Sequence, residues 1–270
     1  MHVTAAGVEV PALGFGTARM SEYETEYRAV EAALEAGYRH VDTAQIYGSE
    51  PAVGDALADS DLDREDVFLT TKLAGENRSY DAVVESTRES LDDLDTSYVD
   101  LLLIHWPVDD VSTEETLRAM NDLRDDGLVR HLGVSNFSVP QLREAREASD
   151  APVVANQVEY NVGNRQDELL AYCIEEGVML TAYSPLGVGE LLDDETLGTV
   201  ADRHDRTAAQ VAIRWLLQQP MVSTVPMSSS PAHVRENFDV FDFELSGEEM
   251  RELFGVEGEP DADLTAKLGL

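Results

Sequence analysis

The stretch Val99-Asp100-Leu101-Leu102-Leu103-Ile104 decides the fold class. It is apolar on both alternating faces, as strands are in a parallel sheet that helices cover on both sides. Seven other short apolar runs share this character. They cover residues 13–16, 40–42, 67–72, 129–135, 153–157, 178–183 and 222–226.

The segments between these runs show helical periodicity. The predicted helices cover residues 23–36, 51–58, 81–93, 114–125, 140–149, 166–176 and 208–219. Gly37, Gly127 and Gly177 each follow such a pattern, as glycine commonly does at helix C-termini. Successive runs are roughly 30 residues apart, which is the size of a strand-helix unit.

Eight strand-helix units predict an α/β protein with a (β/α)8 TIM barrel and an N-terminal hairpin. We expect residues 1–270 to form a single barrel domain. A doubly wound sheet is the competing fold. As a dinucleotide binder it would normally carry G-x-G-x-x-G after its first strand, and the sequence has neither that motif nor a Walker loop.

The charge of the chain restricts its partners. It has 54 Asp+Glu against 19 Lys+Arg, a net charge of -35, and such a surface repels nucleic-acid phosphates and anionic lipid. No secretory signal or membrane-spanning run is visible, so we expect a cytoplasmic protein. The single Cys173 excludes a disulfide framework, and the histidines show no ligand spacing, so we expect no metal.

Lysine is almost absent. Only Lys72 and Lys267 occur, and the carboxylate-rich surface indicates adaptation to high salt, with an acidic mesophilic protein as the alternative. Because Lys72 lies in an apolar strand context, it is a candidate for a specific task.

Polar residues close several of the apolar runs, where a barrel places its chemistry. Helix capping would explain Asp42, Ser135 and Asn136, but it explains Lys72 and His105 poorly. A buried lysine is costly without a carboxylate partner, and Asp42 is the natural one.

Eight segments together resemble the aldo-keto reductases. The first is Gly37-Tyr38-Arg39-His40-Val41-Asp42-Thr43-Ala44 with Tyr47-Gly48-Ser49-Glu50. The others, in chain order, are 13–17, 71–72, 103–107, 133–137, 156–160, 182–187 and 225–228, the last running on through 236–238. The chain resembles short prokaryotic members of the diketogluconate reductase type. The resemblance implies a (β/α)8 barrel, in agreement with the strand count.

The resemblance also implies NAD(P)H-dependent reduction of small aldehydes, ketones or sugar-derived carbonyls. The family's catalytic tetrad matches Asp42, Tyr47, Lys72 and His105. Hydride would pass from the nicotinamide to the carbonyl carbon, and Tyr47 would supply the proton. Lys72 would stabilise the tyrosinate and Asp42 would hold the ammonium. His105 would orient the carbonyl oxygen.

Other binding residues are implied by position. Tyr183 would stack on the nicotinamide, and Trp106 would contact substrate with His105. The nicotinamide carboxamide would be hydrogen-bonded by Ser135, Asn136 and Gln157, and the adenosine end of the cofactor would be bound by Ser228, Glu236 and Asn237. The implied cofactor contacts are Thr17, Asp42, Ser135, Asn136, Gln157, Tyr183, Ser184, Leu186, Ala209, Ser228, Glu236 and Asn237.

The sequence departs from the family pattern in two places. Met227 and His233 stand where a lysine and an arginine usually face the 2′-phosphate of NADPH, so NADH or dual use becomes plausible unless Arg235 or Arg19 substitutes. Ala18 replaces a large aromatic, which predicts a wider pocket.

Two other functions compete with that of a reductase. One is a cofactor-binding regulatory subunit of the same fold with weak turnover, and the other is a metal-dependent barrel hydrolase. The hydrolase needs a cluster of ligands at the strand ends, where only His105 and Asp42 qualify. We expect a carbonyl substrate as partner and a monomeric protein.

Overall fold

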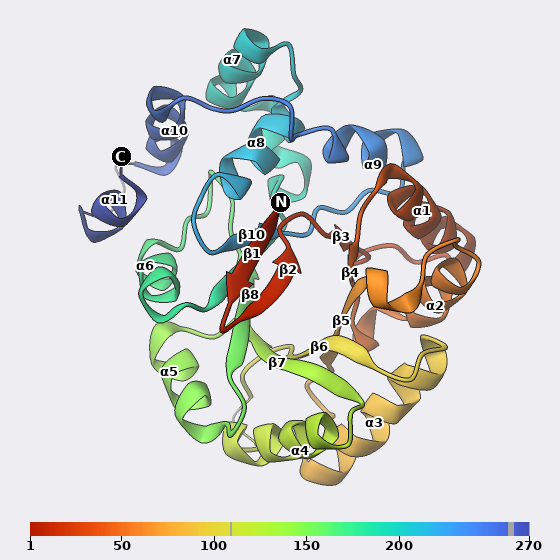
Figure 1. Ribbon diagram of the computed structural model, residues 1–270. Coiled ribbons are helices and arrows are strands. Elements are labelled where there is room, and N and C mark those ends of the chain that lie inside the picture. The colour runs from red at the N-terminus through yellow and green to blue at the C-terminus, as the bar shows by residue number, and fades with distance from the viewer. Residues whose placement is uncertain (109, 259–261, 270) are drawn as a thin grey trace.

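The computed structural model describes residues 1–108, 110–258 and 262–269. Eight parallel strands form a ring at the centre, and helices surround it (Figure 1). The strands are β3 (Phe15–Gly16), β4 (His40–Asp42), β5 (Phe68–Leu73), β6 (Val99–Ile104), β7 (Val129–Ser135), β8 (Val153–Glu159), β9 (Met179–Tyr183) and β10 (Val222–Thr224). Each strand pairs with the next in the chain, which confirms the predicted (β/α)8 barrel.

The two ends of the sheet meet between β3 and β10. Leu13 forms a parallel bridge with Thr224, and the Gly16 N–H donates to the main-chain oxygen of Pro226 at 3.0 Å. A Cβ on Gly16 would lie 2.8 Å from the carbonyl oxygen of Val225. The close approach that completes the barrel therefore requires glycine at this position.

Seven helices match the predicted ones within two residues at each end. They are α1 (Tyr23–Ala36), α2 (Glu50–Ala58), α3 (Tyr80–Asp93), α4 (Thr113–Asp125), α5 (Val139–Ala148), α6 (Asp167–Glu176) and α8 (Ala208–Leu217). Gly37 and Gly177 cap α1 and α6 in the left-handed conformation, as the sequence predicts. Because a side chain is strained there, glycine ends these helices at little cost.

The described residues also contain short helices that periodicity did not predict. They are α7 (Glu195–His204), α9 (Pro231–Phe238), α10 (Gly247–Phe254) and α11 (Ala262–Leu268). Helix α10 begins with a capping box in which Ser246 and Glu249 bond each other's main chain. That pattern was readable in the sequence, whereas the helix is too short for its apolar spacing to stand out.

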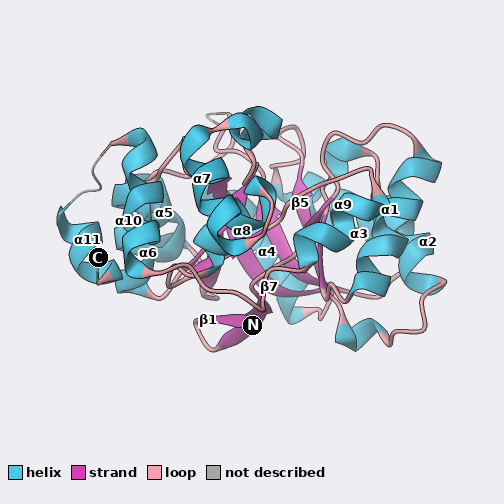
Figure 2. Ribbon diagram, turned by 90° about the horizontal axis from the view of Figure 1, so that it is seen from above, coloured by secondary structure: helices cyan, strands magenta, loops and turns pink. Residues whose placement is uncertain are grey.

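The predicted N-terminal hairpin is present. Strands β1 (His2–Ala5) and β2 (Val8–Pro11) pair antiparallel through a two-residue turn, where Ala6 and Gly7 have φ angles of 49° and 82°. The hairpin covers the end of the barrel where the parallel strands begin (Figures 1 and 2). In such barrels, the active site lies at the opposite end, where the parallel strands finish. Among the described residues, no helix is long and apolar enough to cross a membrane.

Candidate active site

The carboxyl ends of the parallel strands bring polar side chains from six strands to one rim. They are Asp42 at the end of β4, Lys72 in β5, His105 directly after β6, Ser135 at the end of β7, Gln157 in β8 and Tyr183 at the end of β9. Because parallel strands all end on the same side, residues far apart in sequence become neighbours here.

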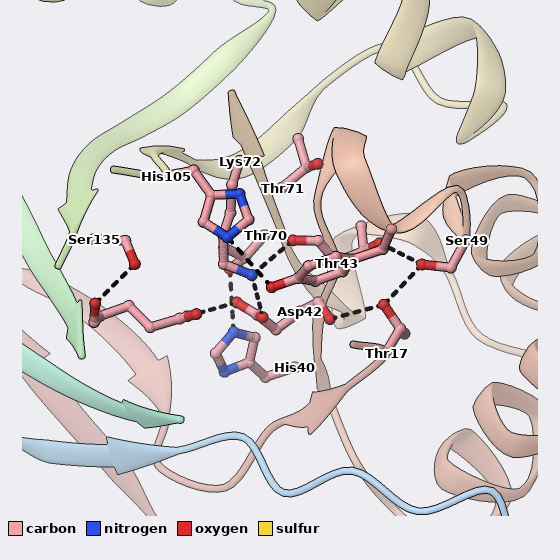
Figure 3. Close-up of polar contacts among 12 residues, drawn as sticks. Thr17, His40, Asp42, Thr43, Ser49, Thr70, Thr71, Lys72, His105 and Ser135 are labelled. Atoms are coloured by element: carbon pink, nitrogen blue, oxygen red, sulfur yellow. Dashed lines mark hydrogen bonds and ion pairs between the residues drawn. The ribbon is translucent and has the colours of Figure 1, made fainter. Parts of the chain in front are cut away.

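A buried ion pair lies at the centre of this rim (Figure 3). Lys72 Nζ donates to Asp42 Oδ1 at 2.5 Å and to the main-chain oxygen of Thr43 at 2.8 Å. The side chains of Lys72 and Asp42 are 0% and 4% exposed. The second carboxylate oxygen, Oδ2, accepts a hydrogen bond from Gln157 Nε2 at 2.7 Å. The pairing that the sequence predicts for Lys72 is therefore present.

Lys72 remains protonated although its side chain is buried. Burial alone lowers the pKa of an ammonium, but the interactions of Lys72 with Asp42 and Tyr47 outweigh it, and the pKa of Lys72 lies above its ordinary value. The site therefore holds a fixed positive charge at neutral pH.

Tyr47 lies between this charge and His105. Lys72 Nζ is 5.0 Å from the centroid of the Tyr47 ring, and the Tyr47 hydroxyl is 3.5 Å from His105 Nε2. The two rings meet edge to face at 82° with their centroids 5.6 Å apart. The phenol is thus placed beside both a cation and an imidazole.

His105 is uncharged at neutral pH. Burial lowers the pKa of the imidazole to about 4, and the nearby Lys72 charge lowers it further while Asp42 opposes the shift. Its Nδ1 is buried and has no hydrogen-bond partner among the described residues. The ring therefore adds no second positive charge to the site.

The loop that carries Tyr47 is held from behind by hydroxyl groups. A short 3₁₀ turn, Gln45–Tyr47, follows β4, and Gly48 leaves it at a φ angle of 71°. Ser49 Oγ then lies 2.9 Å from the hydroxyls of both Thr17 and Thr43. These contacts tie the loop to the ends of β3 and β4, so the position of Tyr47 is fixed by the barrel.

Amide and hydroxyl groups form the neighbouring part of the rim. Asn136 Nδ2 donates to the main-chain oxygen of His105 at 3.0 Å, and the Tyr183 hydroxyl donates to Asn136 Oδ1 at 3.0 Å. Ser135 Oγ donates to the main-chain oxygen of Gln157 at 2.8 Å. Asn136 has a φ angle of 62°, which asparagine tolerates better than most residues.

These groups surround a cavity of about 900 Å³. Every proposed cofactor contact except Thr17 lies in its wall, as do Tyr47, His105 and Trp106. The cofactor contacts in the wall are Asp42, Ser135, Asn136, Gln157, Tyr183, Ser184, Leu186, Ala209, Ser228, Glu236 and Asn237. Thr17 is fully buried behind the wall, which passes through its neighbours Gly16 and Ala18, and the Thr17 hydroxyl lies 2.9 Å from that of Ser49.

The far end of the cavity carries little positive charge. Met227 and His233 line it. Arg235 does not: its Nη2 pairs with Glu35 Oε2 at 3.0 Å, and the two side chains are 54% and 61% exposed. Arg19 lies in the wall and forms no ion pair within the described parts of the chain. Of the two substitute cations considered from the sequence, only Arg19 faces the cavity.

Sequence reasoning missed the apolar entrance of the cavity. Ile46, Val188 and Leu192 are exposed, and they line the cavity with Trp106. Val188 and Leu192 belong to the irregular segment Gly187–Asp193, in which Val188 has a φ angle of 58°. A signal existed in the apolar residues beside Gly187 and Gly189, just after a strand end, but the side that such a segment faces is not readable from sequence.

The structure also shows where Cys173 lies and whether side chains are grouped to bind a metal ion. Cys173 is buried in α6, as expected, and burial raises the pKa of its thiol to about 12. In the part of the chain that the structure describes, no group of three or more His, Cys, Asp or Glu side chains is arranged to hold a metal ion.

Similarity to known proteins in sequence and structure identifies the family of this chain. The sequence profile of the Aldo/keto reductase family matches residues 12–257. Glyoxal reductase of Bacillus subtilis (strain 168) is 41% identical over 244 residues, which span 90% of this chain and 88% of that protein.

Two solved structures are similar as well. One, provisionally described as a 2,5-diketo-D-gluconic acid reductase B, has a TM-score of 0.92 and 45% identity, covering 94% of this chain and 90% of that one. The other, a Bombyx mori aldo-keto reductase in complex with NADP, has a TM-score of 0.89 and 33% identity, covering 95% and 92%.

The chain therefore belongs to the aldo-keto reductase family. It is an NAD(P)H-dependent oxidoreductase that reduces carbonyl groups. The resemblance read from the eight sequence segments is confirmed, including its likeness to a diketogluconate reductase.

Proposed function

We propose that this protein reduces small aldehydes, ketones or sugar-derived carbonyls to alcohols, with NADH or NADPH as reductant and Tyr47 as the proton donor. The observation that carries the proposal is the buried Lys72–Asp42 ion pair beside the Tyr47 ring, at the wall of a large cavity. A weakly active regulatory subunit would have no need of this costly charge at the site.

The cavity fits a dinucleotide. Its volume of about 900 Å³ lies in the range of cofactor sites, and it runs from the rim to α9. Gln157 Oε1 has no hydrogen-bond partner among the described residues, so it is available to accept from a carboxamide. Ser135 and Asn136 offer polar atoms beside it, and Tyr183 offers an aromatic face. A bound reduced nicotinamide supplies hydride to the carbonyl carbon.

The proton comes from Tyr47 in this proposal. As negative charge develops on the carbonyl oxygen, the phenol O–H bond breaks and the O–H bond of the alcohol forms. The Lys72 ammonium stabilises the phenolate that remains, and Asp42 holds the ammonium in place. Water then returns a proton to the phenolate.

His105 orients the substrate. With its proton on Nε2, the neutral ring donates toward the carbonyl oxygen, near the Tyr47 hydroxyl. Its neutrality also matters, because an imidazolium here would repel the Lys72 ammonium.

The entrance favours neutral carbonyl compounds. Exposed apolar side chains of Ile46, Trp106, Val188 and Leu192 line the way in, and Ala18 leaves room where a large aromatic would narrow the cavity. A net charge of -35 also lowers the local concentration of anions. Glyoxal, the compound named for the Bacillus relative, is a neutral carbonyl of this kind. We therefore expect such compounds to be better substrates than carboxylate-bearing ones.

Discrimination between NADH and NADPH is weak in this proposal. Met227 and His233 supply no fixed charge for a 2′-phosphate, and Arg235 is paired with Glu35. Arg19 is the remaining arginine in the cavity wall. We further propose that residues 1–270 act as one domain and as a cytoplasmic monomer, and that the surface is adapted to high salt.

Initial rates of NADH and NADPH oxidation test this proposal. The panel contains glyoxal, an aromatic aldehyde, a neutral ketone and a 2-oxo acid, each at low and at molar KCl. We expect turnover of the neutral compounds with both cofactors, at higher rates in salt because screening reduces the self-repulsion of the surface. Absence of turnover at both salt concentrations, with cofactor still bound, would favour the regulatory subunit.

A further inference from the structure

Arg78 is a buried cation for which the reaction described above has no use. It lies between β5 and α3, its exposed fraction is 0%, and within the described residues no carboxylate pairs with it. Burial lowers the pKa of its guanidinium to about 10, so the group stays charged at neutral pH. Burying a cation without a counter-ion is costly, and an apolar side chain of the same size would fill the space at lower cost. A cation at this position therefore requires an explanation beyond packing.

The contacts of Arg78 point to one loop of the active site. Nη1 donates to the main-chain oxygen of Trp106 at 2.6 Å, and Nε donates to Thr116 Oγ1 at 3.0 Å. The Thr116 hydroxyl in turn donates to the main-chain oxygen of Arg78 at 2.7 Å. Nη2 is buried and has no partner in the described residues. Arg78 thus joins the loop after β6 to helix α4.

The hydrogen bond from Arg78 to the main-chain oxygen of Trp106 connects Arg78 to the active site. Trp106 directly follows His105, and the two rings lie nearly parallel at 15° with centroids 5.8 Å apart. Its side chain is 46% exposed and lines the cavity. Asn136 Nδ2 holds the preceding carbonyl, that of His105, at 3.0 Å. Two consecutive carbonyls are therefore fixed by side chains from two other loops, and Arg78 fixes that of Trp106.

The loop that carries Arg78 also contacts the loop that carries Tyr47. Gln45 Oε1 accepts hydrogen bonds from the Ala74 N–H at 2.8 Å and from Asn77 Nδ2 at 3.0 Å. Residues 74–78 therefore connect the loop of the proposed proton donor with the loop of the substrate wall.

We propose that Arg78 is a positioning residue that sets substrate specificity by holding Trp106 against His105 at the cavity wall. This inference rests on the proposed function. It concerns substrates large enough to touch Trp106, whereas glyoxal reaches the Tyr47 and His105 groups with little contact to that ring. Loss of the guanidinium frees the Trp106 main chain, and the wall loses its fixed shape.

Kinetics of Arg78→Met and Arg78→Lys test the proposal. For Arg78→Met we expect KM for an aromatic aldehyde to rise about tenfold or more, the loss typical of a charge-assisted hydrogen bond. The KM for glyoxal and the Kd for the cofactor should change less than about twofold, the scatter of a site without lost contacts. Arg78→Lys keeps the charge and one donor, so it should recover part of the loss.

Arg214→Met is the matched control. Arg214 is also buried, at 5% exposed, but it lies in α8 and does not line the cavity. Its replacement should lower the melting temperature without separating the two aldehydes. If Arg78→Met behaves in the same way, with parallel losses for both aldehydes, Arg78 only stabilises the fold and the proposal is overturned.

Tryptophan fluorescence gives a readout that needs no turnover. The chain has two tryptophans, and Trp215 is 0% exposed, so acrylamide quenching reports on Trp106. We expect Arg78→Met to change the quenching of Trp106 under conditions where the protein stays folded. Unchanged quenching would overturn the inference. A wild type that reduces no carbonyl, with quenching changed in Arg78→Met, would instead show that the proposed function has failed.

Discussion

The two ends of the cavity are built differently. At the rim, Lys72 and Asp42 are buried and each makes two polar contacts, so neither can change without leaving a charge unpaired. At the far end, Met227 and His233 lie in the wall, and the nearby Arg235 is half exposed and paired elsewhere. Exposed charges contribute little to stability, whereas buried ones are costly to disturb. The comparison implies that the chemistry is rigidly specified by this fold, while the cofactor preference can vary at small cost.

The largest expected effect is at the buried pair. Lys72→Met leaves the Asp42 carboxylate without its partner, which should cost about 3–5 kcal/mol of unfolding free energy and remove activity. The double variant Lys72→Met/Asp42→Asn removes both charges and should regain part of that stability while remaining inactive. Urea unfolding at molar KCl measures both.

The exposed pair Arg28–Glu24, whose side chains are both 67% exposed, is the control for that experiment. Arg28→Met should hardly change the unfolding midpoint. If Lys72→Met were as mild as Arg28→Met, the rim would not depend on its ion pair, and the contrast between the two ends would disappear.

The next effect is at the far end. Met227→Lys restores a point charge there and should shift the ratio of kcat/KM toward NADPH by about ten- to a hundredfold, or about 1–3 kcal/mol. NADH lacks the phosphate and should respond little, and the shift should shrink as salt rises. Steady-state rates with both cofactors measure the ratio.

Arg235→Ala is the companion variant, and it should leave that ratio unchanged because Arg235 pairs with Glu35. A wild type that already prefers NADPH a hundredfold would show that another cation contacts the phosphate, with Arg19 as the first candidate. Equal changes for both cofactors in Met227→Lys would contradict the assignment of this end of the cavity.

The smallest expected effect concerns the pH dependence of kcat/KM. An ordinary histidine titrates near pH 6.5, but the pKa of His105 is lowered to about 4. The folded protein therefore binds a proton at His105 only as the pH falls toward about 4, and from there up to neutral pH the ring is neutral. We expect kcat/KM to show no transition of His105 near pH 6.5. A transition there that disappears in His105→Gln would contradict this account.

Much of the fold was predictable because parallel strands and their helices have strong local signals. The strand 99–104 is apolar throughout, and α1 begins and ends at the predicted residues. Helices α9 and α10 have eight residues each, which is too few turns for periodicity to reveal.

The site also contains residues that the sequence reveals and residues that only the fold reveals. Lys72 stood out because an apolar strand is a costly place for a cation. Arg78 did not, because it lies in a polar loop segment, and only the fold shows that the loop buries it against Trp106. The entrance segment Gly187–Asp193 was missed for a related reason, since its backbone turns at Val188 rather than following a regular element. Thr17, which the resemblance assigns to the cofactor, is buried behind the wall with its hydroxyl 2.9 Å from that of Ser49, and its predicted role stays a prediction.

The measurement that tests the central claim most directly is the kcat of Tyr47→Phe beside its Kd for the cofactor. The variant lacks the proposed proton donor but keeps the aromatic ring next to Lys72, so kcat should fall by about 10²–10⁴. The Kd should stay within about twofold of wild type, since the hydroxyl contributes little to holding the dinucleotide. Tyr27→Phe, which removes a hydroxyl on α1 bonded to Asp59, should keep full activity. If Tyr47→Phe retained more than about a tenth of the wild-type kcat, against the usual general-acid effect, the proton would come from another group.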